Sequence, residues 1–325
     1  MSKFVFNNKF NRIKTIKYAG KTFGVIFRYA LLLAIGYIVL FPMLSAVITA
    51  IKAEKAFFDL SLYWIPKYVS IDSFKAAFNA LDYPTAFTRT LTLNIVSAII
   101  EIIMCAVVAY GFARFDFKFK KLFNFLLIMT IIIPTQVYIV SMILNFKSMD
   151  VLGILGLFNK FTGIDIRPNI LDTNLTFYLP SLFAMGLRSG ILIYIYIQFF
   201  SGLPKELEEA AAIDGAGPFK TFYSIAIPSS SVVIVTVSVF SIVWHWNDYY
   251  LSQMYMTGNY PLAVKLSEIS EALKMNNQFM GAASTSMIDA SKMAGCVLFI
   301  IPVLIFYLCI QNKFVKSIDR VGITG

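Results

Sequence analysis

Long apolar segments separated by shorter polar ones dominate the pattern of this chain. A helix needs about 20 residues to cross about 30 Å of hydrocarbon, because it rises about 1.5 Å per residue. Windows of that length and character occur at residues 29–51, 91–113, 122–146, 175–200, 227–247 and 293–311. They do not show the alternation over about ten residues that marks barrel strands. The pattern predicts an all-α membrane protein with six transmembrane helices.

Several predicted spans contain residues that interrupt helices. These residues are Pro42, Pro134, Gly186, Gly190 and Pro302. In lipid, such breaks persist where neighbouring helices or a water-filled path satisfy the freed backbone groups. A bundle with an internal path is therefore expected, although each proline taken alone could be a simple kink.

Composition supports a membrane location and excludes several other classes. Hydrophobic residues make up 58% of 325 positions and charged residues 14%, which is more apolar surface than soluble domains of this length bury. The net charge of +10 could suggest nucleic acid, but the basic residues cluster beside apolar segments and not on one polar face. The three cysteines and the single His245 show no spacing typical of a disulfide framework or a metal site.

The distribution of Lys and Arg predicts the orientation of the chain. An arm at residues 1–28 carries seven basic residues and no acid, and the apolar segment after it is too long for a cleaved signal. Together with residues 114–121, 201–226 and the C-terminal tail, this side carries 16 basic residues. The opposite side has longer segments and fewer basic residues, so both termini are expected to be cytoplasmic. The transmembrane permease domain is expected at residues 29–325.

The most informative polar segment is SGLPKELEEAAAIDGAGPFKTFYSIAIP, from Ser201 to Pro228. Prolines at 204 and 218 suit the first position of a helix, and the acidic residues after Pro204 complement the helix dipole. Gly215 can take the left-handed conformation that ends a helix. A helix of about ten residues is marginal alone in water, so this hairpin must pack against something. It could enter a groove on another protein or pack on its own bundle, and the physical argument leaves both open.

The same segment resembles the signature loop of permease subunits of ATP-binding-cassette importers. That family shows Glu-Ala-Ala, three residues, Gly, nine residues, then Ile, one residue, an aliphatic residue and Pro. The matching residues here are Glu209, Ala210, Ala211, Gly215, Ile225, Ile227 and Pro228. Asp214 and Ala216 fit the form found in the carbohydrate-uptake branch.

Other parts of the chain, over roughly residues 25–325, resemble the same branch, and in particular the maltose-type second inner-membrane permease. They are AYGFARFDF at 109–117, Pro134 with Gln136, Trp246-Asn247-Asp248 and the tail at 313–325. Two features depart from the family. Ile197 stands where many relatives have Arg, and the chain stops at Gly325, where relatives often continue.

The resemblance implies a type I importer permease fold in a bacterial inner membrane. It further implies a second, related permease subunit, two cytoplasmic ATPase subunits and an extracellular substrate-binding protein, with a sugar, expected to be an oligosaccharide, as cargo. The loop at 201–226 would be the coupling element. Its ATPase-coupling residues would be Glu206, Glu209, Ala210, Ala211, Asp214, Gly215, Ala216 and Phe219. Because the chain has no phosphate-binding Gly-x4-Gly-Lys-Ser/Thr loop, no enzyme activity, cofactor or metal is expected on it, and ATP and Mg belong to the partner ATPases.

Residues that could contact a sugar along the path need aromatic faces or hydrogen-bonding groups near breaks in the spans. The candidates are Asn94, Gln136, Tyr138, Trp246 and Asn247. Interfacial anchoring or helix packing is the alternative for each of them.

The two charges inside the predicted spans, Glu101 and Arg188, are expected to pair with each other. A bare charge there costs on the order of 3 kcal/mol. The alternative is that Glu101 relays protons in a secondary transporter. A membrane enzyme is set aside, because the external segments show no acidic cluster with the spacing of a metal site. Nothing in the chain identifies the sugar.

Overall fold

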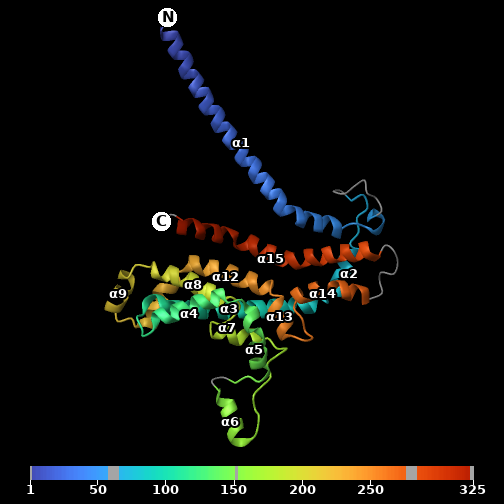
Figure 1. The fold of residues 1–325 in the computed structure, drawn as a ribbon, viewed down its shortest axis with the longest axis vertical. Helices are drawn as coiled ribbons and strands as arrows, with labels where there is room; N and C mark the ends of the chain where they lie inside the picture. Colours follow the sequence, from blue (N-terminus) through green and yellow to red (C-terminus); the bar gives the residue numbers. More distant parts are fainter. Residues whose placement is uncertain (1, 58–65, 151–152, 276–283, 323–325) are drawn as a thin grey trace. The chain divides into compact units, whose positions relative to one another are not determined.

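The computed structural model describes residues 2–57, 66–150, 153–275 and 284–322. These residues are mostly helical and form two compact units (Figure 1). Unit 1 comprises Met1–Ala77 and Asn277–Val297, and unit 2 comprises Phe78–Asn276 and Leu298–Gly325. These two units do not correspond to the predicted division into a basic arm at 1–28 and a transmembrane domain at 29–325. That division concerns the location of the segments relative to the membrane, and it stays a prediction.

Unit 1 is built from a long first helix and short segments that follow it. Helix α1 spans Ser2–Ala50 with Pro42 inside it, and the 3-10 helix η1 spans Glu54–Phe57. An isolated antiparallel bridge joins Lys52 to Val69. The described side chains of α1 are largely exposed between Lys21 and Leu44, as expected for an apolar helix whose surroundings are lipid or another chain.

Unit 2 contains most of the remaining helices and is organised around α3. The first group is α3 (Tyr83–Arg114), α4 (Lys120–Ile132), α5 (Thr135–Lys147), α6 (Ile154–Thr162), α7 (Leu175–Leu182) and α8 (Ser189–Ser201). The second group is α9 (Glu206–Ile213), α10 (Pro218–Thr221), the π-helix η3 (Phe222–Ala226), α11 (Ile227–Ser229), α12 (Ser231–Trp246), α13 (Tyr250–Tyr255) and α14 (Leu262–Met275). Two helices pass from one unit to the other, α2 (Asp72–Ala80) and α15 (Ser284–Gly322).

Three of the predicted spans, 122–146, 175–200 and 227–247, are broken in the structure. For the first two, the interrupting residues explain where. Pro134 lies between α4 and α5, which bend by 100° relative to each other, because proline cannot donate the next helical hydrogen bond. The predicted span at 175–200 is divided into α7 and α8. Between them Ala184 and Arg188 have positive φ angles of 54° and 58°, a conformation that interrupts a right-handed helix.

By length and apolar character, three helices in the described part of the chain can cross a membrane. They are Lys21–Ala50, Tyr83–Arg114 and Thr285–Asn312. The number rises to five if each bent pair, Lys120–Ile132 with Thr135–Lys147 and Pro218–Ser229 with Ser231–Trp246, is one span. The remaining predicted span contributes Ser189–Ser201 as a shorter apolar helix.

The interior of unit 2 forms where α3 packs on α8 and α12. Small residues on α3, Cys105, Ala106 and Ala109, face the larger Tyr196 and Phe200 of α8 in one buried cluster. Small side chains let membrane helices approach closely. Gly190 shows the same principle between α8 and α4, since a Cβ atom there would lie 2.6 Å from the Thr130 hydroxyl.

Candidate functional site

The segment with the signature spacing forms a compact helical hairpin at one end of unit 2, where Figure 1 shows α9. Helix α9 ends in a left-handed glycine, Gly215, with φ +76°. The Gly215 N–H donates to the Ala212 carbonyl at 3.0 Å, and the Ala216 N–H donates to the Ala211 carbonyl at 2.9 Å. These two bonds define a Schellman cap, so the predicted role of Gly215 in the turn is confirmed. Gly217 next takes an extended conformation, and Pro218 begins α10.

An ion pair attaches this hairpin to the end of α3. The Arg114 guanidinium donates through Nη2 to the Leu203 carbonyl at 2.8 Å, and its Nε lies 2.9 Å from Glu208 Oε1. That second contact is an ion pair without hydrogen-bond geometry. Tyr110 on the preceding turn donates its hydroxyl to the same Glu208 oxygen at 3.2 Å. Both charged side chains are mostly buried, 6% and 22% exposed, so the pair is little screened by solvent.

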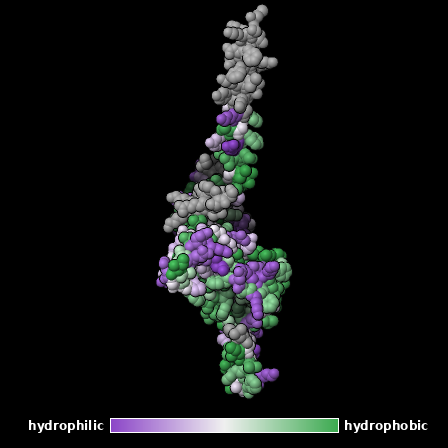
Figure 2. All heavy atoms as spheres, turned by 90° about the vertical axis from the view of Figure 1, so that its left-hand side faces the viewer, coloured by the Kyte–Doolittle hydropathy of each residue, from purple (hydrophilic) through white to green (hydrophobic). Residues whose placement is uncertain are grey.

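The outer side of the hairpin presents apolar side chains that nothing in the described chain covers. Ile213 and Phe219 are each 87% exposed, and Tyr223 is 77% exposed. Glu206 and Glu209 are exposed beside them, whereas Ala211 is buried against the chain. Figure 2, which looks onto this end of unit 2, shows hydrophilic residues gathered around smaller hydrophobic areas. An exposed apolar patch with a polar rim is typical of a protein-binding surface.

The predicted coupling residues therefore divide into two groups. Exposed positions available to a partner are Glu206, Glu209, Ala210, Asp214, Gly215 and Phe219. Ala211 and the partly buried Ala216 shape the turn from within. Sequence reasoning missed Arg114, Tyr110 and Glu208 as the attachment. They lie within or beside the two motifs AYGFARFDF and KELEEAAAIDG, which is the one signal that could have found them.

Two of the candidate path residues lie in the packed interior. Asn94 is 1% exposed and donates its amide to the Ile242 carbonyl at 2.8 Å, joining α3 to α12. Trp246 is 4% exposed and donates its indole N–H to the Phe299 carbonyl at 3.2 Å. Both contacts are between helices, which is the packing alternative that the sequence left open.

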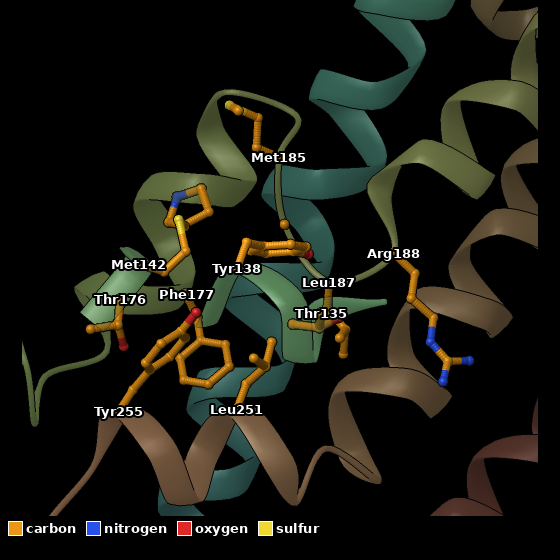
Figure 3. Close-up of a pocket in the computed structure, with 12 residues that line it drawn as sticks. Thr135, Tyr138, Met142, Thr176, Phe177, Met185, Leu187, Arg188, Leu251 and Tyr255 are labelled. Carbon is orange, nitrogen blue, oxygen red and sulfur yellow. The ribbon is translucent and has the colours of Figure 1, made fainter. Parts of the chain in front are cut away.

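The other three candidates are exposed. Asn247 donates to the Val243 carbonyl of its own helix at 2.8 Å, and Gln136 lies in the first turn of α5. Tyr138 lines a small hollow where α5 meets the break between α7 and α8. Figure 3 shows Tyr138 beside the rings of Phe177 and Tyr255 in this hollow. Among the five path candidates, Tyr138 is thus the one that lines this hollow.

The expected pair of Glu101 with Arg188 is wrong. Glu101 is fully buried, and its two oxygens accept hydrogen bonds from Ser189 at 2.6 Å and Ser241 at 2.7 Å. His245 Nδ1 lies 3.7 Å from Glu101 Oε2. Arg188 instead places its guanidinium over the Trp244 ring, 5.1 Å from the centroid. The positive φ at Arg188 aims the neighbouring Ser189, and not Arg188 itself, at the carboxylate.

The chain matches a known protein family over most of its length. The family described as "Binding-protein-dependent transport system inner membrane component" matches residues 102–320. This region contains the end of α3, the hairpin and most of the remaining helices of unit 2.

Individual relatives match nearly the whole chain. The "Probable starch degradation products transport system permease protein AmyC" of Thermoanaerobacterium thermosulfurigenes is 25% identical, covering 85% of this chain and 89% of the relative. The trehalose transport system permease protein SugB of Mycobacterium tuberculosis is 25% identical, covering 90% and 95%. A chain in the crystal structure of a bacterial transporter that imports the acidic polysaccharide alginate aligns with a TM-score of 0.69 and 19% identity, covering 90% of this chain and 97% of that one. This likeness confirms the predicted fold class.

Proposed function

Because the chain belongs to the family of binding-protein-dependent transport system inner membrane components, we propose that it is the pore-forming subunit of an ATP-driven importer and carries a sugar, expected to be an oligosaccharide. The resemblance to permeases of ATP-binding-cassette importers is confirmed by the family match and the relatives. Relatives named for starch degradation products and trehalose support a carbohydrate cargo.

Family membership makes the chain a transport subunit that works with other proteins. Its partners would be a second, related permease, two ATPases that bind ATP and Mg, and an external substrate-binding protein. No nucleotide, cofactor or metal would bind to this chain. The concentration of basic residues at 1–28 and 114–121 supports a cytoplasmic location for both termini and for the hairpin.

The observation that carries the proposal is the exposed hairpin attached to α3. Its apolar side chains, Ile213 and Phe219, are almost fully exposed, and burying them in a groove of an ATPase would stabilise the complex. The Schellman cap fixes the turn within the hairpin, and the contacts of Arg114 with Glu208 and with the Leu203 carbonyl connect the hairpin to α3. Closure of the ATPases on ATP would therefore move α3 and the helices packed on it, and the nucleotide would favour one state by differential affinity.

Gly215 and Gly217 provide a matched test of this coupling role. A Cβ atom at either position meets no atom within 4 Å, but only Gly215 has a positive φ. Gly215→Val should therefore strain the turn and lower ATP-driven uptake at least about tenfold, since a β-branched residue is strongly disfavoured there. Gly217→Val, in an extended conformation, should transport like the parent protein. Uptake by the reconstituted transporter and membrane content of the variants are the measurements; unchanged uptake in Gly215→Val would refute the coupling role.

A proton-coupled carrier is not favoured. Glu101 would be its proton relay, but both carboxylate oxygens are hydrogen-bonded inside the packed helices and the side chain is 0% exposed.

A further inference from the structure

The four arginines of unit 2 whose side chains the structure describes fall into two pairs with opposite surroundings. Arg114 contacts Glu208, and Arg167 donates two hydrogen bonds to Asp165, through Nε at 2.8 Å and Nη2 at 2.7 Å. Arg89 and Arg188 have no carboxylate oxygen within 4.0 Å among the described residues. A guanidinium stays charged in proteins, so these two cations lack the compensation that the other two receive within the chain.

Arg89 lies at the beginning of α3, beside a hollow lined with polar groups. The hollow is a shallow, open depression of the surface that is lined by Pro84, Thr85, Thr88, Arg89, Thr92 and Asn174. Among the described residues, the Nη2 of Arg89 donates only to the Met256 sulfur, at 3.9 Å, and its buried Nε has no hydrogen-bond partner. A thioether is a weak acceptor. In Arg167, by contrast, the same two nitrogens, Nε and Nη2, both donate to the carboxylate of Asp165.

The other groups around this hollow are those that recognise hydroxyl-rich molecules. Thr88 and Thr92 donate their hydroxyl protons to the carbonyls of Pro84 and Thr88, both at 2.8 Å, so their exposed oxygens remain as acceptors. The Asn174 amide donates to the Tyr178 hydroxyl at 3.1 Å, whereas its buried Oδ1 accepts nothing. The hollow therefore combines one uncompensated cation with several unused acceptors.

Arg188 lies at the second break in the chain, near the middle of α3. It begins α8, and the next residue, Ser189, contacts Glu101. Glu101 follows Arg89 by 12 residues on α3, a distance of about 18 Å along the helix axis. The Arg188 side chain is exposed and covers Trp244, which stacks on Phe240 with ring centroids 5.2 Å apart. Arg188 also lines the hollow of Tyr138 and Tyr255, and Figure 3 shows its guanidinium at the side of that hollow, directed away from both tyrosines.

Building on the proposed function, we propose that Arg89 and Arg188 form two successive contact sites for an acidic sugar, a saccharide whose units carry carboxylates. Arg89 receives the carboxylate at the external end, where the exposed oxygens of Thr88 and Thr92 accept the sugar hydroxyl protons. Arg188 receives a second carboxylate further along α3, at the level of Glu101, and Tyr138, which lines the same hollow as Arg188, offers its ring to the sugar. Arginine suits this role because its planar donors match a carboxylate.

The experiment uses the intact transporter in liposomes, with ATP on the ATPase side and the binding protein on the other. A uronic-acid trisaccharide and its methyl ester are compared, since the ester has the same sugar without the charge. Arg89→Gln and Arg188→Gln should each lower the maximal uptake rate of the acid about tenfold, as expected for loss of a charge-assisted hydrogen bond. Uptake of the ester should stay at the parent rate. Arg167→Gln is the matched control, because it neutralises an external arginine that already has its own carboxylate.

Each other outcome overturns the inference in a recognisable way. Equal loss of acid and ester uptake in a variant, or loss of subunit assembly on size-exclusion chromatography, would show a structural role for that arginine. Equal uptake of acid and ester by the parent protein would show that charge is not recognised. Uptake of a neutral sugar without any uptake of the acid would overturn the acidic class and leave the proposed function intact. If neither kind of sugar enters while the complex hydrolyses ATP, the proposed function falls as well.

Discussion

The two ends of α3 each carry an arginine, and the two have opposite surroundings. At the last residue of the helix, Arg114 contacts the Leu203 carbonyl and Glu208, and both charged side chains are mostly buried. In the second turn, Arg89 donates to the Met256 thioether and to no other acceptor among the described residues, and it lines an open hollow. The chain thus supplies the partner of the arginine at one end and leaves the other without one.

The difference shows at which end of α3 the arginine has a carboxylate partner within the described chain. A guanidinium with a carboxylate and a carbonyl fixes the segment that supplies them, so the hairpin and α3 move together. A guanidinium without an anion stays available for a ligand, because nothing in its surroundings competes for it. Structure-building and ligand-binding arginines can therefore be distinguished on one helix by their partners.

Arg114→Gln should have the largest effect. It leaves Tyr110 as the one remaining polar partner of the Glu208 carboxylate among the described residues, and it removes the donor to the Leu203 carbonyl. Hydrogen bonds to charged groups contribute about 2 kcal/mol, so the hairpin should detach from α3 and uptake should fall about tenfold. Thermal unfolding of the purified complex and ATP-driven uptake are the measurements.

Arg89→Gln is the control for this prediction at the other end of the same helix. It removes no ion pair within the described chain, so the unfolding temperature should be unchanged even where acid uptake falls. Arg114→Lys should be intermediate, because one ammonium cannot reach both acceptors in the fork geometry of arginine. If Arg114→Gln and Arg89→Gln destabilised the complex equally, the contrast between the two ends would be wrong.

Glu101→Gln, in the middle of α3, should have a moderate effect. The amide can still accept from one serine and donate to the other, because the hydroxyls of Ser189 and Ser241 can rotate. Uptake should therefore stay within about twofold of the parent rate, as expected when no buried polar group is left unpaired. The control is uptake after the proton gradient is collapsed with an ionophore. A proton-coupled carrier would instead be supported if Glu101→Gln lost uptake and the parent protein kept its uptake after ATP depletion.

The hairpin could be predicted from the sequence because its determinants are local. Proline at the start of a helix, acidic residues in its first turn and a glycine at its end act within about ten residues. Gly215 accordingly takes the expected left-handed conformation. The apolar windows were predictable for the same reason, since span length depends on a continuous segment. The bends at Pro134 and near Gly186 were visible as interruptions, although their angles were not.

The contacts between helices could not be predicted in the same way. Trp246 packs with Phe87 and Phe299, which lie far from it in the sequence, and no local pattern distinguishes such a packed tryptophan from one lining a path. Glu101 and Arg188 have opposite charges at matching depths, which favoured a pair. The backbone conformation at the break between α7 and α8 determines whether Arg188 or Ser189 faces Glu101. A shift of one residue there would place a guanidinium where the Ser189 hydroxyl now lies.

Asp165→Asn should have the smallest effect and sharpens the comparison with a third arginine. The hydrogen bonds from Arg167 lower the pKa of Asp165 to about 2, below the usual value of about 4. A carboxyl whose pKa is lowered on folding stabilises the folded loop above pH 4, and this contribution is lost as the pH falls through about 2. The pair is exposed, so it should add little even when charged. Uptake by Asp165→Asn and by the parent should therefore follow the same profile between about pH 5 and pH 8. If Asp165→Asn transported less than half as well as the parent across that range, the exposed Arg167–Asp165 pair would contribute to transport beyond its own loop. The exposure of an ion pair would then fail to predict the difference in effect between this pair and the buried Arg114–Glu208 pair.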